Sequence, residues 1–318
     1  MKKLIAIPLL LFALFPAHAQ EWPSKPIRIV HGFGGGGPVD FLARLLAPVL
    51  QERLGQAVLV EGKPGAGGTL GAAFVAKADP DGYTLLLMAA GHSAAPGLYA
   101  SLPYDAANDF TMISMVTRAP HAILVGPSSP VATMQELVQR AKAQPGKLDY
   151  GSAGTGSGMH LMAVLFQARA GVQLSHIPYK TATAVNLAIL SGEVPVIFTA
   201  VAGITPLLDS GKVKMIAVSS KDRYSLLPNI PTISETVLPG FDVTTWYALA
   251  APKGLPAPIV ARLNEAVHVA LKRPDVVEKL RVQMAEPFPS TPRQAQDLLS
   301  SEVARWTKVV RDEKIPPQ

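Results

Sequence analysis

Short aliphatic and β-branched runs alternate along the chain with longer segments in which apolar residues recur at helical spacing. The predicted strands are 27–30, 57–61, 84–88, 111–116, 122–125, 174–177, 194–198, 214–218 and 243–250. The predicted helices are 38–54, 69–78, 133–143, 157–170, 183–191, 204–210, 256–272, 274–284 and 292–312. This alternation predicts an α/β fold with mainly parallel sheets, because parallel strands need helical crossovers.

The number of predicted strands indicates two domains. More than eight strands exceed one comfortable open sheet, so we expect two sheets. One boundary is expected at the apolar crossing 118–120 and the other in the return segment 227–240. Domain 1 would then be discontinuous, with residues 20–118 plus 236–318, and domain 2 would be residues 119–235. Two connections between two α/β domains form a hinge with a cleft beneath it.

The first 19 residues have the pattern of an export signal. Lys2 and Lys3 precede an apolar run over 4–15, and Ala17-His18-Ala19 supplies a small-residue cleavage site. The run is shorter than the ~20 residues that span a bilayer, which disfavours the alternative of a membrane anchor; a buried helix is the other alternative. We therefore expect residues 1–19 to be a signal peptide cleaved near Ala19 and the mature protein to be periplasmic.

Composition narrows the classes of protein that fit. The 318 residues are 48% hydrophobic, include no cysteine and carry a formal net charge of +6. The apolar fraction excludes a disordered chain, and the lack of cysteine excludes a disulfide scaffold. Because Lys and Arg are spread along the chain rather than gathered in blocks, we expect no nucleic-acid partner. We expect a monomer.

A run of four glycines gives the sharpest local signal. The segment His31-Gly32-Phe33-Gly34-Gly35-Gly36-Gly37-Pro38 follows a predicted strand and begins a predicted helix. Glycine allows a tight turn that exposes successive N–H groups, and a helix N-terminus carries about half a positive charge. We interpret the segment as an anion-binding loop. The alternative is a merely flexible loop.

Two further glycine-rich loops have the same placement between a strand and a helix. One spans 61–69 and lacks the Gly-Lys-Ser/Thr ending of a P-loop. The other spans 151–160, in the other half of the chain, where it would face the first loop across the cleft. The N–H groups of two such loops would suit a ligand with one or two carboxylates.

An enzymatic alternative rests on the same glycines. Gly32, Gly34 and Gly37 fit G-x-G-x-x-G, and Glu61 ends the next strand, as in a dinucleotide-binding fold. Export weighs against it, because nicotinamide cofactors are not freely available outside the cytoplasm. The histidines show no metal-binding spacing and the serines fit no nucleophile elbow. We expect no enzyme activity, no cofactor and no metal, with an exported dinucleotide-dependent oxidoreductase as the alternative.

Several longer motifs follow one another in order along the mature chain. They are Pro80-Asp81-Gly82-Tyr83-Thr84-Leu85-Leu86, Pro103-Tyr104-Asp105 with Asn108-Asp109-Phe110, Ala143-Gln144-Pro145-Gly146-Lys147-Leu148, His176-Ile177-Pro178-Tyr179-Lys180, Leu227-Pro228-Asn229-Ile230-Pro231-Thr232 and Trp306. Together they resemble the Bug family, the extracytoplasmic solute receptors of tripartite tricarboxylate transporters. The resemblance implies a type II-like, two-domain periplasmic binding protein with a ligand cleft between its domains. Such a receptor would deliver a small organic carboxylate to membrane permease subunits; a ligand sensor that docks on a signalling partner is the alternative.

The resemblance also implies which residues contact the ligand, which would be a mono- or dicarboxylate. They come from the first loop and the turn after the third strand in domain 1, and from the loop over 151–160 and the strand end near 199 in domain 2. The candidates are Phe33, Gly34, Gly35, Gly36, Gly37, His92, Ser93, Ser152, Gly154, Thr155, Gly156, Ser157, Gly158, His160 and Thr199. Tyr179 is expected to brace a loop rather than to touch the ligand.

Two departures from the family pattern bear on the ligand. Pro38 stands where family members usually carry Thr or Ser, and Thr199 stands where they usually carry Asp. Proline removes an N–H donor as well as a hydroxyl, and the loss of the acid removes a partner for an amino group. These departures favour a less hydrogen-bonded acid, aromatic or long-chain, over an acidic amino acid.

Overall fold

The computed structural model describes residues 22–316, so the predicted signal peptide lies outside the described residues. Its strands are β1 (Ile27–His31), β2 (Val58–Gly62), β3 (Thr84–Ala89), β4 (Phe110–Val125), β5 (Asp149–Ser152), β6 (Ser175–Pro178), β7 (Val196–Ala200), β8 (Lys214–Val218), β9 (Thr244–Pro252) and β10 (Glu286–Pro287). Its helices are α1 (Pro38–Leu54), α2 (Thr69–Ala76), α3 (Ala95–Leu98), α4 (Met134–Ala143), α5 (Gly158–Ala170), α6 (Ala182–Ser191), α7 (Thr205–Asp209), α8 (Ile233–Thr236), α9 (Ala257–Lys272), α10 (Pro274–Val282) and α11 (Pro292–Asp312), with 3-10 turns η1 (Ala66–Gly68) and η2 (Ala90–Ala94).

Within residues 22–316 the strands form one 10-stranded sheet. Its order is β2-β1-β3-β9-β4-β7-β5-β6, and β8 and β10 also pair with β4. β1 pairs in parallel with β2 and β3, and β5 pairs in parallel with β6 and β7. The pairs made by β4 and β9 are antiparallel. The expectation of mainly parallel sheets is therefore wrong for the centre of the sheet, because β4 and β9 run in opposite directions between the two halves of the molecule.

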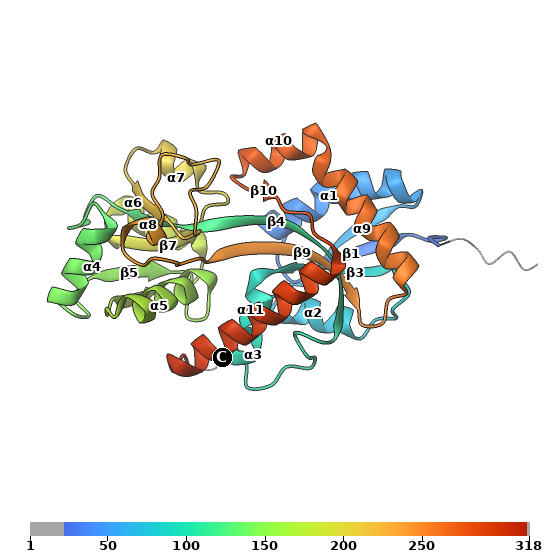
Figure 1. Ribbon diagram of the computed structural model, residues 1–318, viewed down its shortest axis with the longest axis horizontal. Helices are drawn as coiled ribbons and strands as arrows, with labels where there is room; N and C mark the ends of the chain where they lie inside the picture. Colours follow the sequence, from blue (N-terminus) through green and yellow to red (C-terminus); the bar gives the residue numbers. More distant parts are fainter. Residues whose placement is uncertain (1–21, 317–318) are drawn as a thin grey trace, which may run out of the picture.

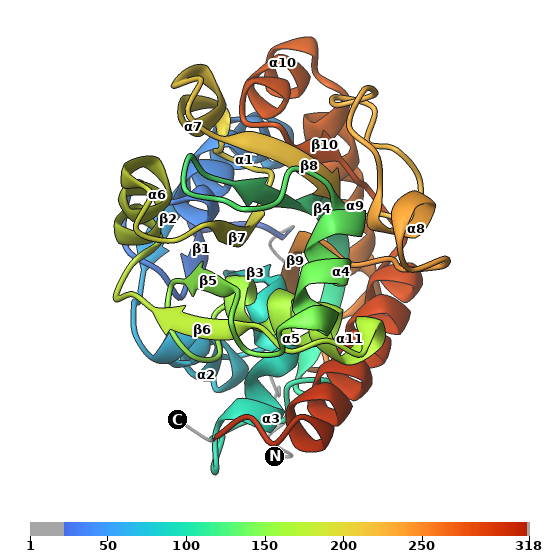
Figure 2. The same cartoon turned by 90° about the vertical axis from the view of Figure 1, so that its left-hand side faces the viewer.

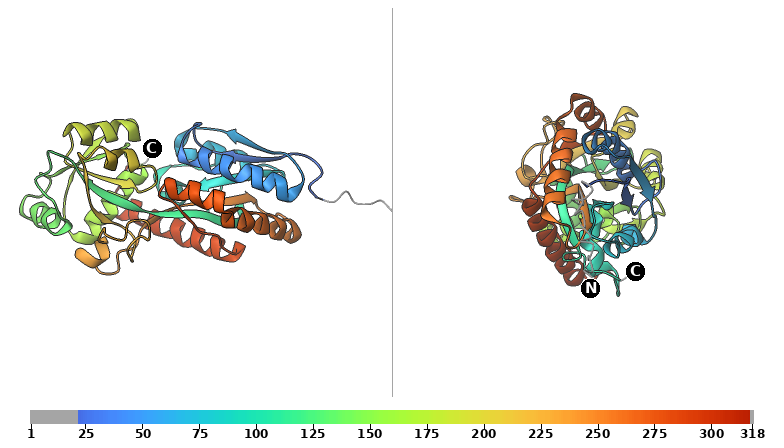
Figure 3. Two further views of the ribbon diagram at one scale, coloured as in Figure 1. Left: turned by 90° about the horizontal axis from the view of Figure 1, so that it is seen from above. Right: turned by 90° about the vertical axis from the view of Figure 1, so that its right-hand side faces the viewer.

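One long strand replaces two predicted ones. β4 spans 16 residues from Phe110 to Val125, and residues 118–120 lie inside it, paired with residues 244–246 of β9. The two expected sheets are present but not separate: residues 110–120 of β4 pair with strands of the first half, residues 121–125 pair with strands of the second half, and β4 joins both into one hydrogen-bonded path. Figures 1 and 3 show β4 and β9 running between the two halves, with α11 alongside.

The first half is layered, with helices on both faces of the sheet. Side chains of a strand point alternately to its two faces. Leu85 and Leu87 of β3 accordingly pack in one core cluster with α1 and α9, whereas Leu86 and Met88 pack in another with α2 and the N-terminal part of α11. These two clusters pack on both faces of β1 and β3. They therefore fix the position of the sheet edge at which both strands end.

The second half repeats this arrangement with other helices. Phe198 of β7 packs with α4 and α5, and Ile197 packs with α6 and α7 on the opposite face. Figure 2 views the molecule from this side, with α6 and α7 apart from α4 and α5. Trp306 of α11 belongs to the same cluster as Phe198, so α11 packs against the cores of both halves.

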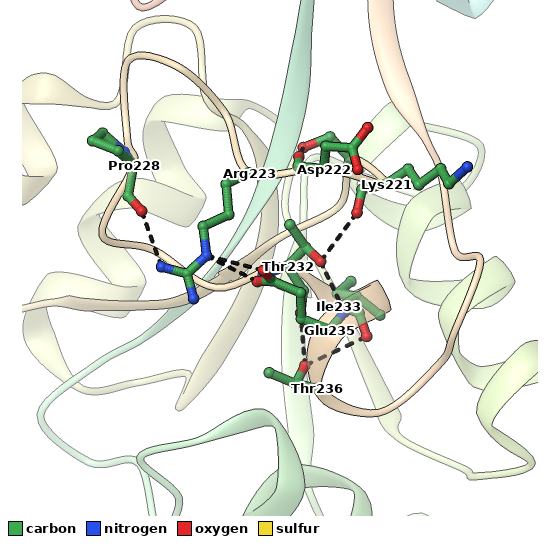
Figure 4. Close-up of polar contacts among 9 residues, drawn as sticks. Lys221, Asp222, Arg223, Pro228, Thr232, Ile233, Glu235 and Thr236 are labelled. Atoms are coloured by element: carbon green, nitrogen blue, oxygen red, sulfur yellow. Dashed lines mark hydrogen bonds and ion pairs between the residues drawn. The ribbon is translucent and has the colours of Figure 1, made fainter.

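The segment before β9 is held by a capped short helix. Thr232 and Glu235 form a capping box at the start of α8, with both N···O distances at 2.9 Å. Arg223 Nε donates to both carboxylate oxygens of Glu235 at 3.0 and 3.1 Å (Figure 4). Ile233 is fully buried in the same cluster as Phe198. The segment therefore packs on the second half; the division into residues 20–118 with 236–318 and 119–235 stays a prediction.

Candidate ligand-binding site

The two candidate loops occupy equivalent places in the two halves. We call residues 32–37, between β1 and α1, the first loop, and residues 152–157, between β5 and α5, the second loop. β1 and β3 are parallel neighbours, so the first loop and η2 lie at one edge of the sheet. β5 and β7 are also parallel neighbours, so the second loop lies at the same edge as Thr199. Ligands of open α/β sheets bind outside such carboxyl ends of strands.

The backbones of the two loops follow one pattern. Gly36 and Gly156 each lie two residues before a helix, with φ of 80° and 78° in the left-handed region that favours glycine. The N–H of Gly36 donates to Asp40 Oδ2 at 3.0 Å. The N–H of Gly156 donates to His160 Nδ1 at 3.1 Å. In both loops, the acceptor is the side chain four residues further on.

The first loop is supported from behind by the loop over 61–69. A Cβ on Gly32 would lie 2.4 Å from Gly68 Cα, and one on Gly71 would lie 2.7 Å from Gly32 Cα. No real Cβ contact is this short, so the backbones meet here because the residues are glycines. The contact fixes where the first loop leaves β1.

The outer side of the first loop is open. A Cβ on Gly34, Gly35 or Gly36 would meet no atom within 4 Å, and all three residues are exposed. Among residues 22–316, the N–H groups of Gly34 and Gly35 have no hydrogen-bond partner. Two successive N–H groups are thus available beside the N-terminus of α1, which attracts negative charge.

The side chain of Asp40 connects the first loop to α1. Its side chain is 7% exposed and accepts from Arg44 Nε at 3.1 and 3.0 Å. The hydrogen bonds from Arg44 and from the N–H of Gly36 lower the pKa of Asp40 to about 2, although burial opposes this shift. An ionised carboxylate only accepts hydrogen bonds, so His31 Nε2, 3.2 Å away, carries the proton that it donates to Asp40.

The second loop is held largely by its own side chains. Ser152 is fully buried, and its Oγ accepts from the N–H of Gly154 at 3.1 Å and lies 2.6 Å from His176 Nε2. The N–H of Ser157 donates to the Gly154 carbonyl at 3.1 Å, and Ser157 Oγ caps α5 by accepting from the N–H of His160 at 3.3 Å. The second loop therefore already uses the N–H group of Gly154, whose counterpart in the first loop, that of Gly34, is open.

Two neutral histidines next to the second loop stack on each other. The rings of His160 and His176 are 4.3 Å apart, and His176 also stacks on Tyr150 at 5.0 Å. Burial lowers the pKa of His160 to about 4 and lowers that of His176 as well. Both rings are uncharged at neutral pH, and α5 has no acidic residue in its first turn. This loop therefore has no negative charge comparable to that of Asp40.

Comparison with known proteins identifies the family. Residues 42–315 match the family described as tripartite tricarboxylate transporter family receptor. The chain belongs to this receptor family. Its members are solute-binding receptors, not enzymes, which confirms the expectation of a family without catalytic activity.

Solved structures share the fold of this receptor over nearly its whole length. Rpa4515 from R. palustris, solved with adipate, has a TM-score of 0.82 at 34% identity over 94% of this chain and 100% of its own. The periplasmic binding protein BugD has a TM-score of 0.78 at 34% identity over 93% and 100%. MatC from Rhodopseudomonas palustris, with bound malate, has a TM-score of 0.78 at 34% identity over 91% and 100%. The predicted α/β periplasmic binding protein fold is confirmed.

Two candidate residues in η2, His92 and Ser93, already have hydrogen-bond partners within the chain. His92 Nε2 bonds the Ala106 carbonyl at 2.9 Å, and burial lowers the pKa of His92 to about 4. Ser93 is fully buried and donates to the Ala90 carbonyl at 2.6 Å. Phe33 and His92 line one cavity of about 20 Å³, room for a single water. The cavity lies between the first loop, the loop over 61–69 and η2, and the role of both residues as ligand contacts stays a prediction.

The remaining candidates lie at or near the second loop. Thr155 is half-buried and Gly158, the first residue of α5, is exposed. Thr199 is half-buried in β7, where it pairs with Ala122 of β4. Tyr179 donates its N–H to the Ser152 carbonyl at 2.8 Å and its hydroxyl to Glu193 at 2.7 Å. It thus ties the chain after β6 to the second loop.

Sequence reasoning missed the residues that hold the loops. Asp40 and His176 are not among the candidates predicted from the sequence. The available signal was a shared spacing: Gly36-x-x-x-Asp40 and Gly156-x-x-x-His160 both place an acceptor four residues after a glycine. The bond from His176 to Ser152 joins residues 24 positions apart and has no local signal.

The acidic residue on which the enzymatic alternative relies is paired within the chain. Glu61, its candidate ribose acid, is bound by Lys63 at 2.7 Å and lies 3.7 Å from Arg28. Within residues 22–316, no group of three or more His, Cys, Asp or Glu side chains could hold a metal ion. In the same part of the chain, no helix combines the length and apolar character needed to cross a membrane.

Proposed function

We propose that this receptor captures a small organic carboxylate with the N–H groups of its two loops and delivers it to membrane permease subunits of a tripartite transporter. One observation carries the proposal: two loops of matched backbone geometry stand at the carboxyl ends of parallel strands, one in each half, each before a helix N-terminus. The relatives solved with adipate and malate support a carboxylate as the ligand.

Binding energy would come from charge-assisted hydrogen bonds. Such bonds are about twice as strong as neutral ones, and a helix N-terminus adds ~0.3–1 kcal/mol for a nearby anion. The open N–H groups of Gly34 and Gly35 would bind one carboxylate oxygen each. The receptor would act as a periplasmic monomer, without cofactor or metal, and ligand-induced approach of the two halves would signal occupancy to the permease.

The ligand would be an acid without an amino group. Thr199 carries no charge, so β7 offers no partner for an ammonium group at this position. Pro38 has neither hydroxyl nor N–H, which leaves fewer polar contacts at the start of α1. These features support an aromatic or long-chain mono- or dicarboxylate.

A thermal-shift screen tests the ligand class. The probes are adipate, malate, benzoate, aspartate and NAD, each at millimolar concentration, followed by calorimetric titration of every hit. A ligand at 100 times its Kd adds ~2.7 kcal/mol of stability and raises Tm. We expect adipate or benzoate to give the largest shift and NAD none. A shift with NAD alone would overturn the proposal, and a shift with aspartate alone would overturn the ligand class.

The partner is tested separately. The ligand-loaded receptor is cross-linked to membranes from its native host and the captured proteins are sequenced. Recovery of the permease subunits, dependent on ligand, supports delivery for transport. Recovery of a sensor kinase instead would replace transport by signalling as the function of the loaded form.

A further inference from the structure

The two loops share one hydrogen-bonding arrangement between the loop backbone and a side chain of the following helix. In an ordinary capping box, the third residue of a helix accepts from the N–H of the cap residue. Asp40 and His160 are the third residues of α1 and α5, but each accepts from the N–H one residue earlier, that of Gly36 or Gly156. The bond therefore closes the loop itself onto the helix.

Both acceptors are buried, and both form hydrogen bonds within the chain. Asp40 has its two oxygens engaged by Gly36, Arg44 and His31. His160 is 7% exposed, and its Nδ1 accepts from Gly156 while its ring stacks on His176. These groups are poorly placed to bind a carboxylate themselves, since Asp40 would repel it and the Nδ1 lone pair of His160 is already used.

We propose that Asp40 and His160 are equivalent positioning residues, each of which holds its loop in the conformation that the ligand meets. The assignment rests on the proposed function of the loops. The left-handed glycine and the acceptor four residues later act together, because the bond orients the peptide before the cap. In the first loop, this peptide sets the direction of the open N–H groups of Gly34 and Gly35 that precede it. A carboxylate and a neutral imidazole perform the same task.

The geometry of Asp40 in the first loop guides the choice of variants at His160 in the second loop. Asp40 shows that a side chain of this length reaches the N–H, so the amide oxygen of His160→Asn stands where Nδ1 now accepts. In His160→Gln, the oxygen is one bond further out, near the position of Nε2. His160→Ala removes the acceptor. Glu136→Ala is the control, because Glu136 accepts from the N–H of Ala132 at 2.7 Å at the start of α4, outside both loops.

The first measurement needs no ligand. Amide hydrogen exchange of Gly36 and Gly156 is followed by NMR in the free receptor. We expect exchange at Gly156 to be on the order of tenfold faster in His160→Ala and His160→Gln, with His160→Asn close to wild type and Gly36 unchanged. Equal exchange in His160→Asn and His160→Gln overturns the assignment of His160, even if His160→Ala does not fold. Asp40→Asn against Asp40→Leu tests Gly36 in the same way.

The second measurement separates this inference from the function on which it rests. Titration with adipate and with malate should give a Kd about tenfold weaker in His160→Gln and Asp40→Leu than in the matched Asn variants, with Glu136→Ala equal to wild type. If the wild type binds no carboxylate, the proposed function fails while the exchange data still judge the loops. If binding is normal in every variant, positioning for the ligand is overturned.

Discussion

The first and second loops reach the same backbone geometry by different chemistry. The first is closed by an ionised carboxylate with an arginine counterion, rests on the backbone of Gly68 and leaves N–H groups open. The second is closed by a neutral histidine and stiffened by a buried serine and a second histidine. The comparison teaches that the loop needs a left-handed glycine and an acceptor at fixed spacing, whereas the charge of the acceptor is free to differ.

The largest expected effect is the loss of stability when the backbone contact that supports the first loop is disturbed. Gly32→Ala forces a Cβ to within 2.4 Å of Gly68, so we expect it to destabilise the receptor by about 3 kcal/mol, the upper range for overpacking. The equivalent position in the second loop already holds Ser152, fully buried. Urea unfolding measures the change. The control is Gly35→Ala, where no atom lies within 4 Å and stability should stay within about 0.5 kcal/mol. Equal midpoints for both variants would contradict the backbone contact.

The next effect concerns the open face of the first loop. Gly35→Val places a branched side chain beside the open N–H groups, in free space, so the fold should be kept while the approach of a carboxylate is blocked. We expect the affinity for the best carboxylate of the screen to fall by at least about 100-fold, or ~2.7 kcal/mol. Calorimetric titration measures it, with an unchanged urea midpoint as the control. Unchanged affinity would remove the first loop from the site.

Elements with local signals could be predicted from the sequence. α11 begins at Pro292 after the cap residue Thr291, which forms a capping box with Gln294, and it spans the predicted residues 292–312. α1 likewise begins at Pro38 and spans the predicted residues 38–54. Caps and proline act within a few residues, so their effects are legible in sequence.

Elements fixed by pairing between distant residues could not be predicted in the same way. Pro120 lies inside the long strand β4 rather than between two strands: it is beside Thr244 of β9, and its carbonyl accepts from the N–H of Val201 at 3.0 Å. The domain boundary at 118–120 stays a prediction. β5 was not predicted as a strand, because its four residues include Gly151 and carry little strand propensity. The site has the same limit: its glycines are legible, whereas the contacts of His160 with His176 are not.

The pH dependence of stability should distinguish the two closing residues. The folded pKa of His160 is about 4 against an unfolded 6.5, so the native state binds fewer protons and loses stability as the pH falls from 6.5 to about 4. For Asp40, the folded pKa of about 2 lies below an unfolded 3.8, so its contribution persists above 3.8 and is lost toward pH 2.

Two variants test these windows. We expect His160→Asn to lose less stability than wild type between pH 6.5 and 4, by on the order of 1 kcal/mol after allowance for solvent screening. Asp40→Asn should follow the wild-type slope over that range and depart from it only below about pH 4. Urea unfolding at closely spaced pH values gives both curves, and the buried histidines that contact neither residue, His92 and His121, cancel in the difference. Parallel curves for wild type and His160→Asn would show that burial of this ring does not disfavour its charge.

The smallest effect tests whether the first loop needs its counterion. Position 164, the equivalent of Arg44 in α5, is Val164, which a neutral His160 can tolerate. Arg44 is 64% exposed, so Arg44→Val should change stability at pH 7 only slightly, because exposed ion pairs contribute little. The pKa of Asp40 should nevertheless rise, because Arg44 is the largest cause of its depression. NMR titration of the Asp40 carboxyl measures the shift, and Arg53→Val, on the same helix and paired with Glu265, is the control. A pKa that stays near 2 would mean that Gly36 and His31 alone stabilise the charge, and that the two loops differ less than their side chains suggest.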